Sequence, residues 1–255
     1  MVGGNKMKNE EFRTLYKGLL NAEYKGKEVW KYFKNSGSLV LTSAPHFVGE
    51  LYEENNNFKL MVVGRAVNGW KHDFESCSNS NDILDCILNQ TFTFEDVIKE
   101  EGIKEETTYF YSKSPFWRLI RKLLESYGEG ENYHKKILWS NLYKIAPRNG
   151  GNPGWRLIKS ELQTYIDIVK KEIDIYKPTH ILFVTDIDYF NHYELNSKYP
   201  RFGEQLEVEE IRGFNFVVAK GKYNHSKIIV CKRPEFRNTD DMVKEIKKVF
   251  EEDIK

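Results

Sequence analysis

The feature that most constrains the fold is an alternation of short apolar runs with long amphipathic segments. The runs Phe58–Val63, Ile137–Asn141 and His180–Val184 have the length of buried strands, and two or three further strands fall within 206–231. Strands that alternate with helices predict a parallel sheet covered on both faces. We therefore expect an α/β fold of three layers, α/β/α, with a central, mainly parallel sheet of four to five strands.

The segments between these runs carry apolar residues at helical spacing. The predicted helices span 8–35 (one or two helices), 81–100, 114–127, 156–176 and 239–253. Ser114 before Pro115 is typical of a helix start, and Pro178 of a helix end. Asn238 or Thr239 is expected to cap the last helix, and residues 1–7 are expected to form a loose polar tail.

The chain has 255 residues, which allows one large domain with an added helical segment. We assign residues 1–57 to an N-terminal helical segment packed on the core and residues 58–255 to the α/β/α domain. The formal net charge is only +1, so a nucleic-acid site has to be a local basic patch. No apolar run approaches the roughly 20 residues that span a bilayer, and the N-terminal residues lack the apolar segment of a signal peptide. We expect a cytoplasmic protein with no membrane partner.

Metal and cofactor chemistry has little support in the sequence. Cys77, Cys86 and Cys231 are scattered without a CxxC pair, which argues against a disulfide framework and against a thiolate metal site. The six histidines show no HExxH-type spacing. Asp186 and Asp188 follow the third apolar run, but no third carboxylate stands close in sequence to complete a metal site. We expect no metal and no cofactor.

Three loops are expected at the carboxyl ends of the strands, where parallel sheets bind ligands. In the first, Gly64–Trp70, the glycines let backbone N–H groups approach a ligand, Arg65 suits a phosphate and Trp70 suits stacking on a ring. The alternative is a tight turn with Trp70 in the core. In the third, 230–237, Arg233 or Lys232 suits a phosphate or an oxyanion, and the alternative is a solvated basic turn.

The second loop follows Asn141, whose side chain offers a donor and an acceptor together. That combination suits the Watson–Crick edge of an extruded base. Lys144 and Arg148 suit contacts to backbone phosphates. The alternative is that Asn141 satisfies backbone groups of its own loop.

Taken in order, these loops resemble the uracil-DNA glycosylase superfamily. Its members carry a first loop of the kind G-Q-D-P-Y-H or G-E-A-P-G, a central strand ending in Asn, and a late strand ending in H-P-S. The corresponding blocks here are Gly64-Arg-Ala-Val, then Ser140-Asn-Leu-Tyr-Lys-Ile-Ala-Pro-Arg-Asn, then Lys232-Arg-Pro-Glu. The middle block and the segment Leu162–Asp186 are similar to the thermophilic-type branch. The resemblance spans about residues 58–238 and implies a uracil-DNA-glycosylase-like fold.

The sequence departs from this family at the positions that matter most for catalysis. Ala66 and Val67 stand where the family has its water-positioning acid or Asn, and Arg233 aligns with its late histidine. The cluster-binding cysteines of the thermophilic branch are absent. Asn68 or Asp73 is therefore our candidate for orienting water, and Arg233 for stabilising the leaving base.

The leading hypothesis is a divergent DNA-processing protein that binds a flipped or modified base, with hydrolysis of the N-glycosidic bond as the reaction of that site. Asn141 would read the base, and Trp70 or Phe74 would stack on it. The residues expected to contact phosphate or developing charge are Arg65, Lys144, Arg148 and Arg233. One alternative is a catalytically inactive module on the same fold that binds a nucleotide or nucleic acid. A second alternative is a small-molecule hydrolase of an unrelated α/β family.

Overall fold

The structure is a computed structural model in which the chain divides into two compact units. It describes residues 2–33, 39–41, 46–54, 58–66, 74, 77–89, 114–149, 151–196 and 198–252. The first unit comprises Met1–Phe47, Arg65–Glu101 and Asn141–Ile175, and the second comprises Val48–Gly64, Gly102–Ser140 and Tyr176–Lys255. The expected division at residue 57 stays a prediction.

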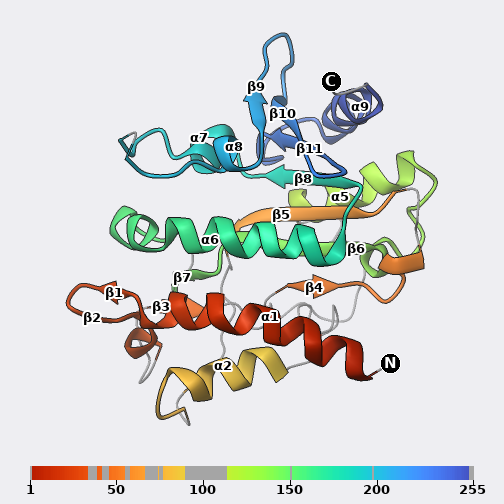
Figure 1. Cartoon of the computed structure of the whole chain (residues 1–255). Helices are drawn as coiled ribbons and strands as arrows, with labels where there is room; N and C mark the ends of the chain where they lie inside the picture. Colours follow the sequence, from red (N-terminus) through yellow and green to blue (C-terminus); the bar gives the residue numbers. More distant parts are fainter. Residues whose placement is uncertain are drawn as a thin grey trace. The chain divides into compact units, whose positions relative to one another are not determined.

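A mixed sheet forms the centre of the second unit (Figure 1). Among the described residues it has seven strands in the order β4-β6-β5-β8-β11-β10-β9. Their bounds are β4 Phe47–Val48, β6 Ile137–Tyr143, β5 Leu60–Ala66, β8 His180–Val184, β11 Ser226–Cys231, β10 Val217–Tyr223 and β9 Val208–Glu210. The strands β5, β8 and β11 pair in parallel, whereas β10 is antiparallel to both β11 and β9. The α/β class is confirmed, but the sheet is wider than the four to five strands expected, because short strands extend both edges.

Helices lie on both faces of this sheet. The helix α9 (Thr239–Glu251) packs on β10 and β11, and the ring of its Phe250 lies 4.9 Å from that of His180 on β8. The short helix α7 (Ile187–Asn191) places Phe190 4.9 Å from Phe183, also on β8. Because successive side chains of a strand point to opposite faces, His180 and Phe183 mark opposite faces of the sheet. The second unit therefore has the α/β/α layering expected from the sequence.

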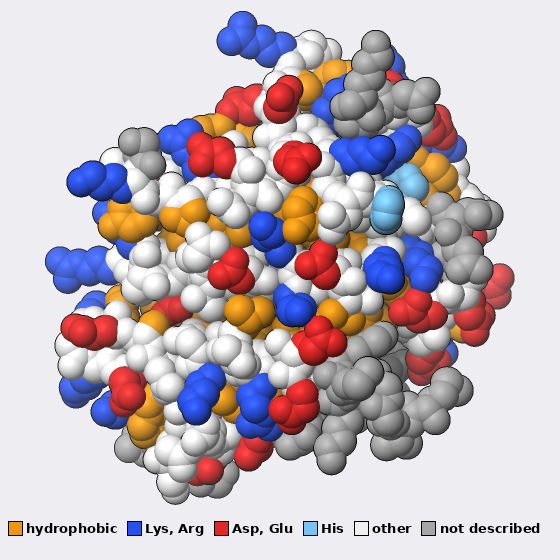
Figure 2. All heavy atoms as spheres, viewed as in Figure 1, with side chains coloured by type: hydrophobic (Ala, Val, Ile, Leu, Met, Phe, Trp, Pro, Cys, Tyr) orange, Lys and Arg blue, Asp and Glu red, His pale blue; other side chains and the backbone are white. Residues whose placement is uncertain are grey.

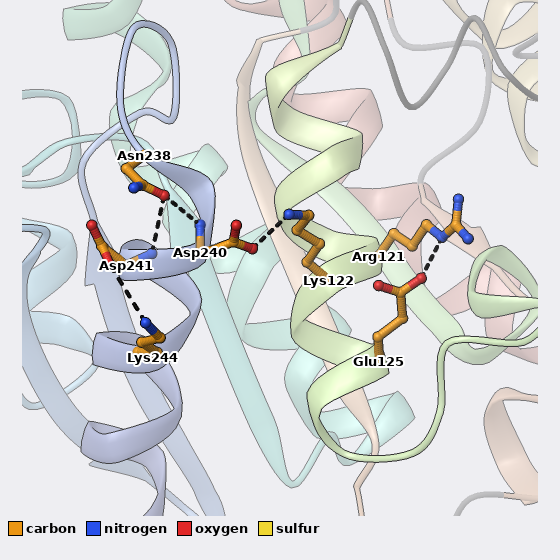
Figure 3. Close-up of polar contacts among 7 residues, drawn as sticks. All are labelled: Arg121, Lys122, Glu125, Asn238, Asp240, Asp241 and Lys244. Carbon is orange, nitrogen blue, oxygen red and sulfur yellow. Dashed lines mark hydrogen bonds and ion pairs between the residues drawn. The ribbon is translucent and has the colours of Figure 1, made fainter.

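The helix α5 (Pro115–Ser126) lies beside α9, and charged side chains join the two (Figure 3). Lys122 Nζ on α5 contacts Asp240 Oδ1 on α9 at 2.5 Å. Both predicted caps are confirmed: Ser114 Oγ accepts a hydrogen bond from the N–H of Trp117, and Asn238 Oδ1 accepts bonds from two N–H groups of α9. The remaining described elements of this unit are α8 Phe202–Gln205, η2 Tyr52–Glu54 and η3 Tyr133–Lys136.

The first unit contains three α-helices among its described residues. These are α1 Val2–Asn21, α2 Ser80–Asn89 and α6 Trp155–Tyr176, of which α1 and α2 pack together. The helix α6 was predicted at nearly the same bounds, whereas α1 begins within the predicted polar tail. The predicted 8–35 helical segment ends early, because Lys25 and Gly26 take positive φ angles and turn the chain into a hairpin of β1 Glu23–Tyr24 and β2 Lys27–Glu28.

Two further differences concern segments that were expected to be helix or loop. The predicted helix 81–100 is α2 up to Asn89, and its remainder lies outside the described residues. The stretch after Lys144 is not a simple loop, because β7 (Ile145–Pro147) pairs with β3 (Leu39–Leu41). The short helix η1 (Val29–Tyr32) completes the described elements of the first unit.

Charges of both signs are interspersed over the face drawn in Figure 2. The described side chains of that face form no extended area of one sign, in keeping with the net charge of +1. None of the helices searched among the described residues is long and apolar enough to cross a membrane.

Candidate functional site

The sheet of the second unit has a topological switch at β5. The next long strand along the chain, β6, lies on one side of β5, and β8 lies on the other side. Ligands of α/β sheets bind beside such a switch, at the carboxyl ends of the strands. The register pairs Val63 with Phe183 and Val184 with Cys231, so β5, β8 and β11 end at the same edge. This edge is therefore the place where the fold favours a site.

Asp186 leaves β8 at this edge in an unusual backbone conformation. Its φ of 63° and ψ of 158° lie in a region that is populated almost only by glycine, at a cost of about 1–3 kcal/mol for other residues. Thr185 beside it is fully buried, and its Oγ1 donates to the carbonyl of Asp186 at 3.2 Å. A half-buried carboxylate held in a strained conformation at a sheet edge is typical of functional sites.

Asp186 is also bonded to the end of the neighbouring strand. Its N–H donates to the carbonyl of Cys231 at 3.1 Å, and its Oδ1 accepts from the N–H of Arg233 at 3.3 Å. Burial, helped by the nearby charge of Asp186, raises the pKa of the Cys231 thiol well above its ordinary value. The thiol of Cys231 therefore stays protonated near neutral pH.

The chain after β11 carries the most exposed aromatic side chain among the described residues. Phe236 is 107% exposed, and its φ of 61° is in the left-handed region. Pro234 is buried and anchors the turn, since its carbonyl accepts a hydrogen bond from the N–H of Arg237 at 3.1 Å. Arg233 and Arg237, both exposed, flank the aromatic ring in sequence. The turn thus presents an exposed aromatic ring with two arginines close to it in sequence.

Glu235 adds an acceptor to the same turn. One of its oxygens pairs with the guanidinium of Arg233. The other, Oε2, is buried and has no hydrogen-bond partner in the described structure. A buried acceptor without a partner is costly unless a ligand or water supplies a donor. We call the group Gly64, Thr185, Asp186, Arg233 and Phe236 the carboxyl-edge site.

Of the residues predicted to bind the substrate, the second unit holds Gly64 and Arg233. Gly64 lies near the end of β5 and Arg233 follows β11, so both residues lie at the carboxyl edge of the sheet, one on each side of β8. Gly64 is buried within β5 rather than in a loop, and its φ is not positive, so the expected glycine turn does not start there. The predicted loop residues Asn68, Trp70 and Asp73 lie outside the described residues, as does Val67.

The first unit holds the other predicted binding residues, at varied depth. Asn141 on β6 is 6% exposed, and Arg65 and Arg148 are half-buried. Phe74 is 1% exposed and packs against the ring of Phe33 at 6.0 Å. The expected stacking of Phe74 on a base does not fit this position, because core packing already covers its ring.

Lys144, predicted to contact a phosphate, lies instead in a buried ion pair. Its Nζ is 2.8 Å from Glu172 Oε1, and the Nδ1 of His46 is 3.8 Å from the same oxygen. Burial acts to raise the pKa of Glu172, but attraction to Lys144 and His46 outweighs it and holds that pKa below its ordinary value. Lys144 is 1% exposed, so its ammonium is not open to a phosphate. The pair holds α6 to the end of β6.

Sequence reasoning missed three features of these units. The sequence suggested only a metal-ligand role for Asp186, although its position directly after an apolar run also indicated the carboxyl end of a strand. Phe236 was passed over within a basic turn. Glu161 on α6 is buried, neither of its carboxyl oxygens has a hydrogen-bond partner among the described residues, and burial raises its pKa to about 8. Its place at helical spacing from Leu157, Ile158 and Tyr165 was the sequence signal for this burial.

Within the described residues, no three His, Cys, Asp or Glu side chains gather as a metal site. Comparison of the chain with models of known protein families and with curated proteins finds no match.

Proposed function

We propose that the chain binds a base extruded from DNA, with the carboxyl-edge site facing the nucleic acid. Phe236 carries the proposal. An exposed aromatic side chain flanked by cations is the chemistry with which proteins enter a base stack and hold its phosphates. Among the described residues the side chain of Phe236 is fully exposed, which is unfavourable in water, whereas insertion of its ring between bases is favourable.

Two further groups support a base rather than a simple anion. The buried Oε2 of Glu235 is an acceptor that suits an exocyclic amino group. The strained carboxylate of Asp186 stands at the switch point, where a pocket for a small ring is expected. A site that binds a simple anion would contain neither the carboxylate of Glu235 nor that of Asp186.

The scaffold is, in this proposal, like that of the uracil-DNA glycosylases. The first and third blocks of the resemblance contain Gly64 and Arg233, whose strands flank β8. In the resemblance these two blocks contact the same ligand, and strands on either side of β8 bring them to the same edge of the sheet. Asn141, the base reader in the resemblance, belongs to the other unit.

Binding is tested with duplexes that carry one uracil opposite guanine, compared with fully paired duplexes of the same length. Tighter binding to the mispaired duplex is expected, because extrusion of a weakly paired base costs less. Phe236→Ala should weaken binding at least tenfold, whereas Phe236→Leu should retain part of it. Arg237→Gln should lower the salt slope of binding by about 0.9.

The matched control is Lys177→Gln. Lys177 is exposed and precedes β8, so it lies at the opposite, amino edge of the sheet. Lys177→Gln should leave the affinity for the duplex and the salt slope of binding nearly unchanged. Absence of binding at low salt, or equal effects of Lys177→Gln and Arg237→Gln, would overturn the proposal.

A second candidate function is hydrolysis of the N-glycosidic bond, favoured by the carboxylate of Asp186. In this reaction Asp186 orients water, the water oxygen joins the sugar C1′, and the base leaves with a proton. The guanidinium of Arg233 stabilises the charge that develops on the leaving base. The predicted water-orienting residues Asn68 and Asp73 remain competing candidates for the role of Asp186.

Release of free uracil or hypoxanthine from duplex DNA measures this reaction. Asp186→Asn should abolish release with little loss of binding, while Asn68→Ala and Asp73→Asn test the competing residues. If wild type releases no base from any substrate, hydrolysis is rejected and the binding proposal stands by itself.

A further inference from the structure

Two cysteines that look unrelated in the sequence lie together in the first unit. The Sγ atoms of Cys77 and Cys86 are 3.6 Å apart. Both side chains are thiols. The two residues are nine positions apart in the sequence, so they do not form a CxxC motif. A disulfide needs an S–S distance of about 2.0 Å, so the two sulfurs have to move only by about the length of one bond.

The approach of the two thiols is fixed by the cap of α2. Asn79 Oδ1 accepts hydrogen bonds from the N–H groups of Asn81 at 2.8 Å and Asp82 at 3.2 Å. Asp82 Oδ2 in turn accepts from the N–H of Ser78 at 2.6 Å. This reciprocal cap bends the chain before the helix, so that Cys77 returns alongside Cys86 on α2. The pair is thus held together by local structure, independently of oxidation.

The two thiols differ in accessibility. Cys86 is half-buried on α2, whereas Cys77 is 3% exposed. A reagent in solution therefore meets Cys86 first. Cys77 is placed to attack the adduct that forms there, which is the division between an attacking and a resolving cysteine.

We propose that Cys77 and Cys86 form a reversible disulfide, with a small-molecule disulfide such as oxidised glutathione as the oxidant. The Cys86 thiolate attacks the oxidant, its S–S bond breaks, and one reduced thiol leaves. The Cys77 thiolate then attacks Cys86 Sγ and expels the second reduced thiol. Two protein thiols are oxidised and one small disulfide is reduced, so electrons and atoms balance.

The disulfide would lie next to Phe74, because the N–H of Cys77 donates to the carbonyl of Phe74 at 3.0 Å. The third cysteine, Cys231, is fully buried in the second unit and serves as an internal control.

The test is incubation of the folded full chain with oxidised glutathione, followed by intact mass and peptide mapping. Wild type and Cys231→Ser should each lose two hydrogen atoms of mass, with the disulfide mapped to Cys77 and Cys86, and dithiothreitol should reverse the change. Cys77→Ser should accumulate a glutathione adduct at Cys86, because the resolving thiol is missing.

Wild type that keeps all three thiols, that stops at the adduct on Cys86, or that links either residue to Cys231 would overturn the proposal. Circular dichroism of the serine variants checks that they fold. The wild-type and Cys231→Ser results decide the matter even where Cys77→Ser does not fold.

Discussion

The N–H of Arg233 donates a hydrogen bond to Oδ1 of Asp186 at 3.3 Å, and this bond joins the ends of two neighbouring parallel strands. The N–H of Asp186 completes the link by donating to the carbonyl of Cys231. The positive φ of Asp186 is therefore held by its hydrogen bonds to Cys231 on β11 and to Arg233 just after it, rather than by its own preference.

A comparison of Asp186→Gly with Asp186→Ala tests this strain. Both variants lose the carboxylate, but glycine adopts a φ of 63° and a ψ of 158° without the steric cost that alanine bears. We expect the glycine variant to be the more stable by about 1–2 kcal/mol, the reverse of the usual order. Urea unfolding measures the difference, and an alanine variant as stable as the glycine variant would contradict it.

Phe236 should matter for binding and not for stability. Its side chain is fully exposed, so Phe236→Ala should change the free energy of unfolding by less than about 0.5 kcal/mol. Phe236→Gly should stabilise the fold by up to about 1 kcal/mol, because a φ of 61° suits glycine. Thermal and urea unfolding check both. A loss of more than about 1 kcal/mol in Phe236→Ala would mean that the ring packs on the protein.

The longer strands and helices of the second unit were predictable because they have strong local signals. The run His180–Val184 has the strand bounds found in the structure, and Ser114 and Asn238 form the caps that their residue types favour. The strand β9 lies within 206–231, where two or three strands were expected, whereas the strand β4 was not predicted, since a strand of two residues forms only where a neighbouring strand offers backbone partners.

The site was only partly predictable for a related reason. Strand ends can be read from a sequence, so Gly64 and Arg233 were expected near the ends of β5 and β11, where they lie. Their role in binding stays a prediction. The burial of Lys144 depends on Glu172, which lies far along the chain on α6, and no local pattern announces such a pair. The meeting of Cys77 with Cys86 likewise depends on the cap at Asn79.

The buried pair Lys144–Glu172 should behave as a coupled unit. Glu172→Leu leaves the Lys144 ammonium buried without its partner, and we expect a loss of about 3–5 kcal/mol. Lys144→Met should cost a similar amount. The double variant should cost clearly less than the sum, because both charges are removed together. A double-mutant cycle in urea measures the coupling, and additive losses would show that the pair contributes nothing.

His180 should make the second unit sensitive to acid. Burial between Phe58 and Phe250, with repulsion from Lys227, lowers its pKa to about 4 from an ordinary 6.5. The unfolded state then binds the proton more readily than the folded state between these values, so stability falls as pH drops from 6.5 to 4. His180→Phe should reduce this fall by about 2 kcal/mol. Unfolding measured at pH 7 and pH 4 tests it, and an unchanged fall would exclude His180 as its source.

Glu161 should impose the opposite dependence on the first unit. Its carboxyl oxygens are buried without hydrogen-bond partners among the described residues, and burial raises its pKa to about 8 from 4.5. The folded state therefore binds a proton more tightly than the unfolded state between pH 4.5 and 8. Stability contributed by the neutral carboxyl is complete below pH 4.5 and is lost as pH rises through 8. Glu161→Gln stays neutral, so it should gain on the order of a few kcal/mol relative to wild type at pH 9 and little at pH 4.

Urea unfolding of both proteins across this pH range measures the gain. The matched control is Asp174→Asn on the same helix, where the carboxylate is exposed and its neutralisation should give only a small change that does not follow this profile. A gain in Glu161→Gln that is constant from pH 4 to pH 9 would contradict the prediction, because it would arise from the amide's contacts rather than from the proton. A gain that grows between pH 4.5 and 8 would show that α6 carries a neutral carboxylic acid at neutral pH.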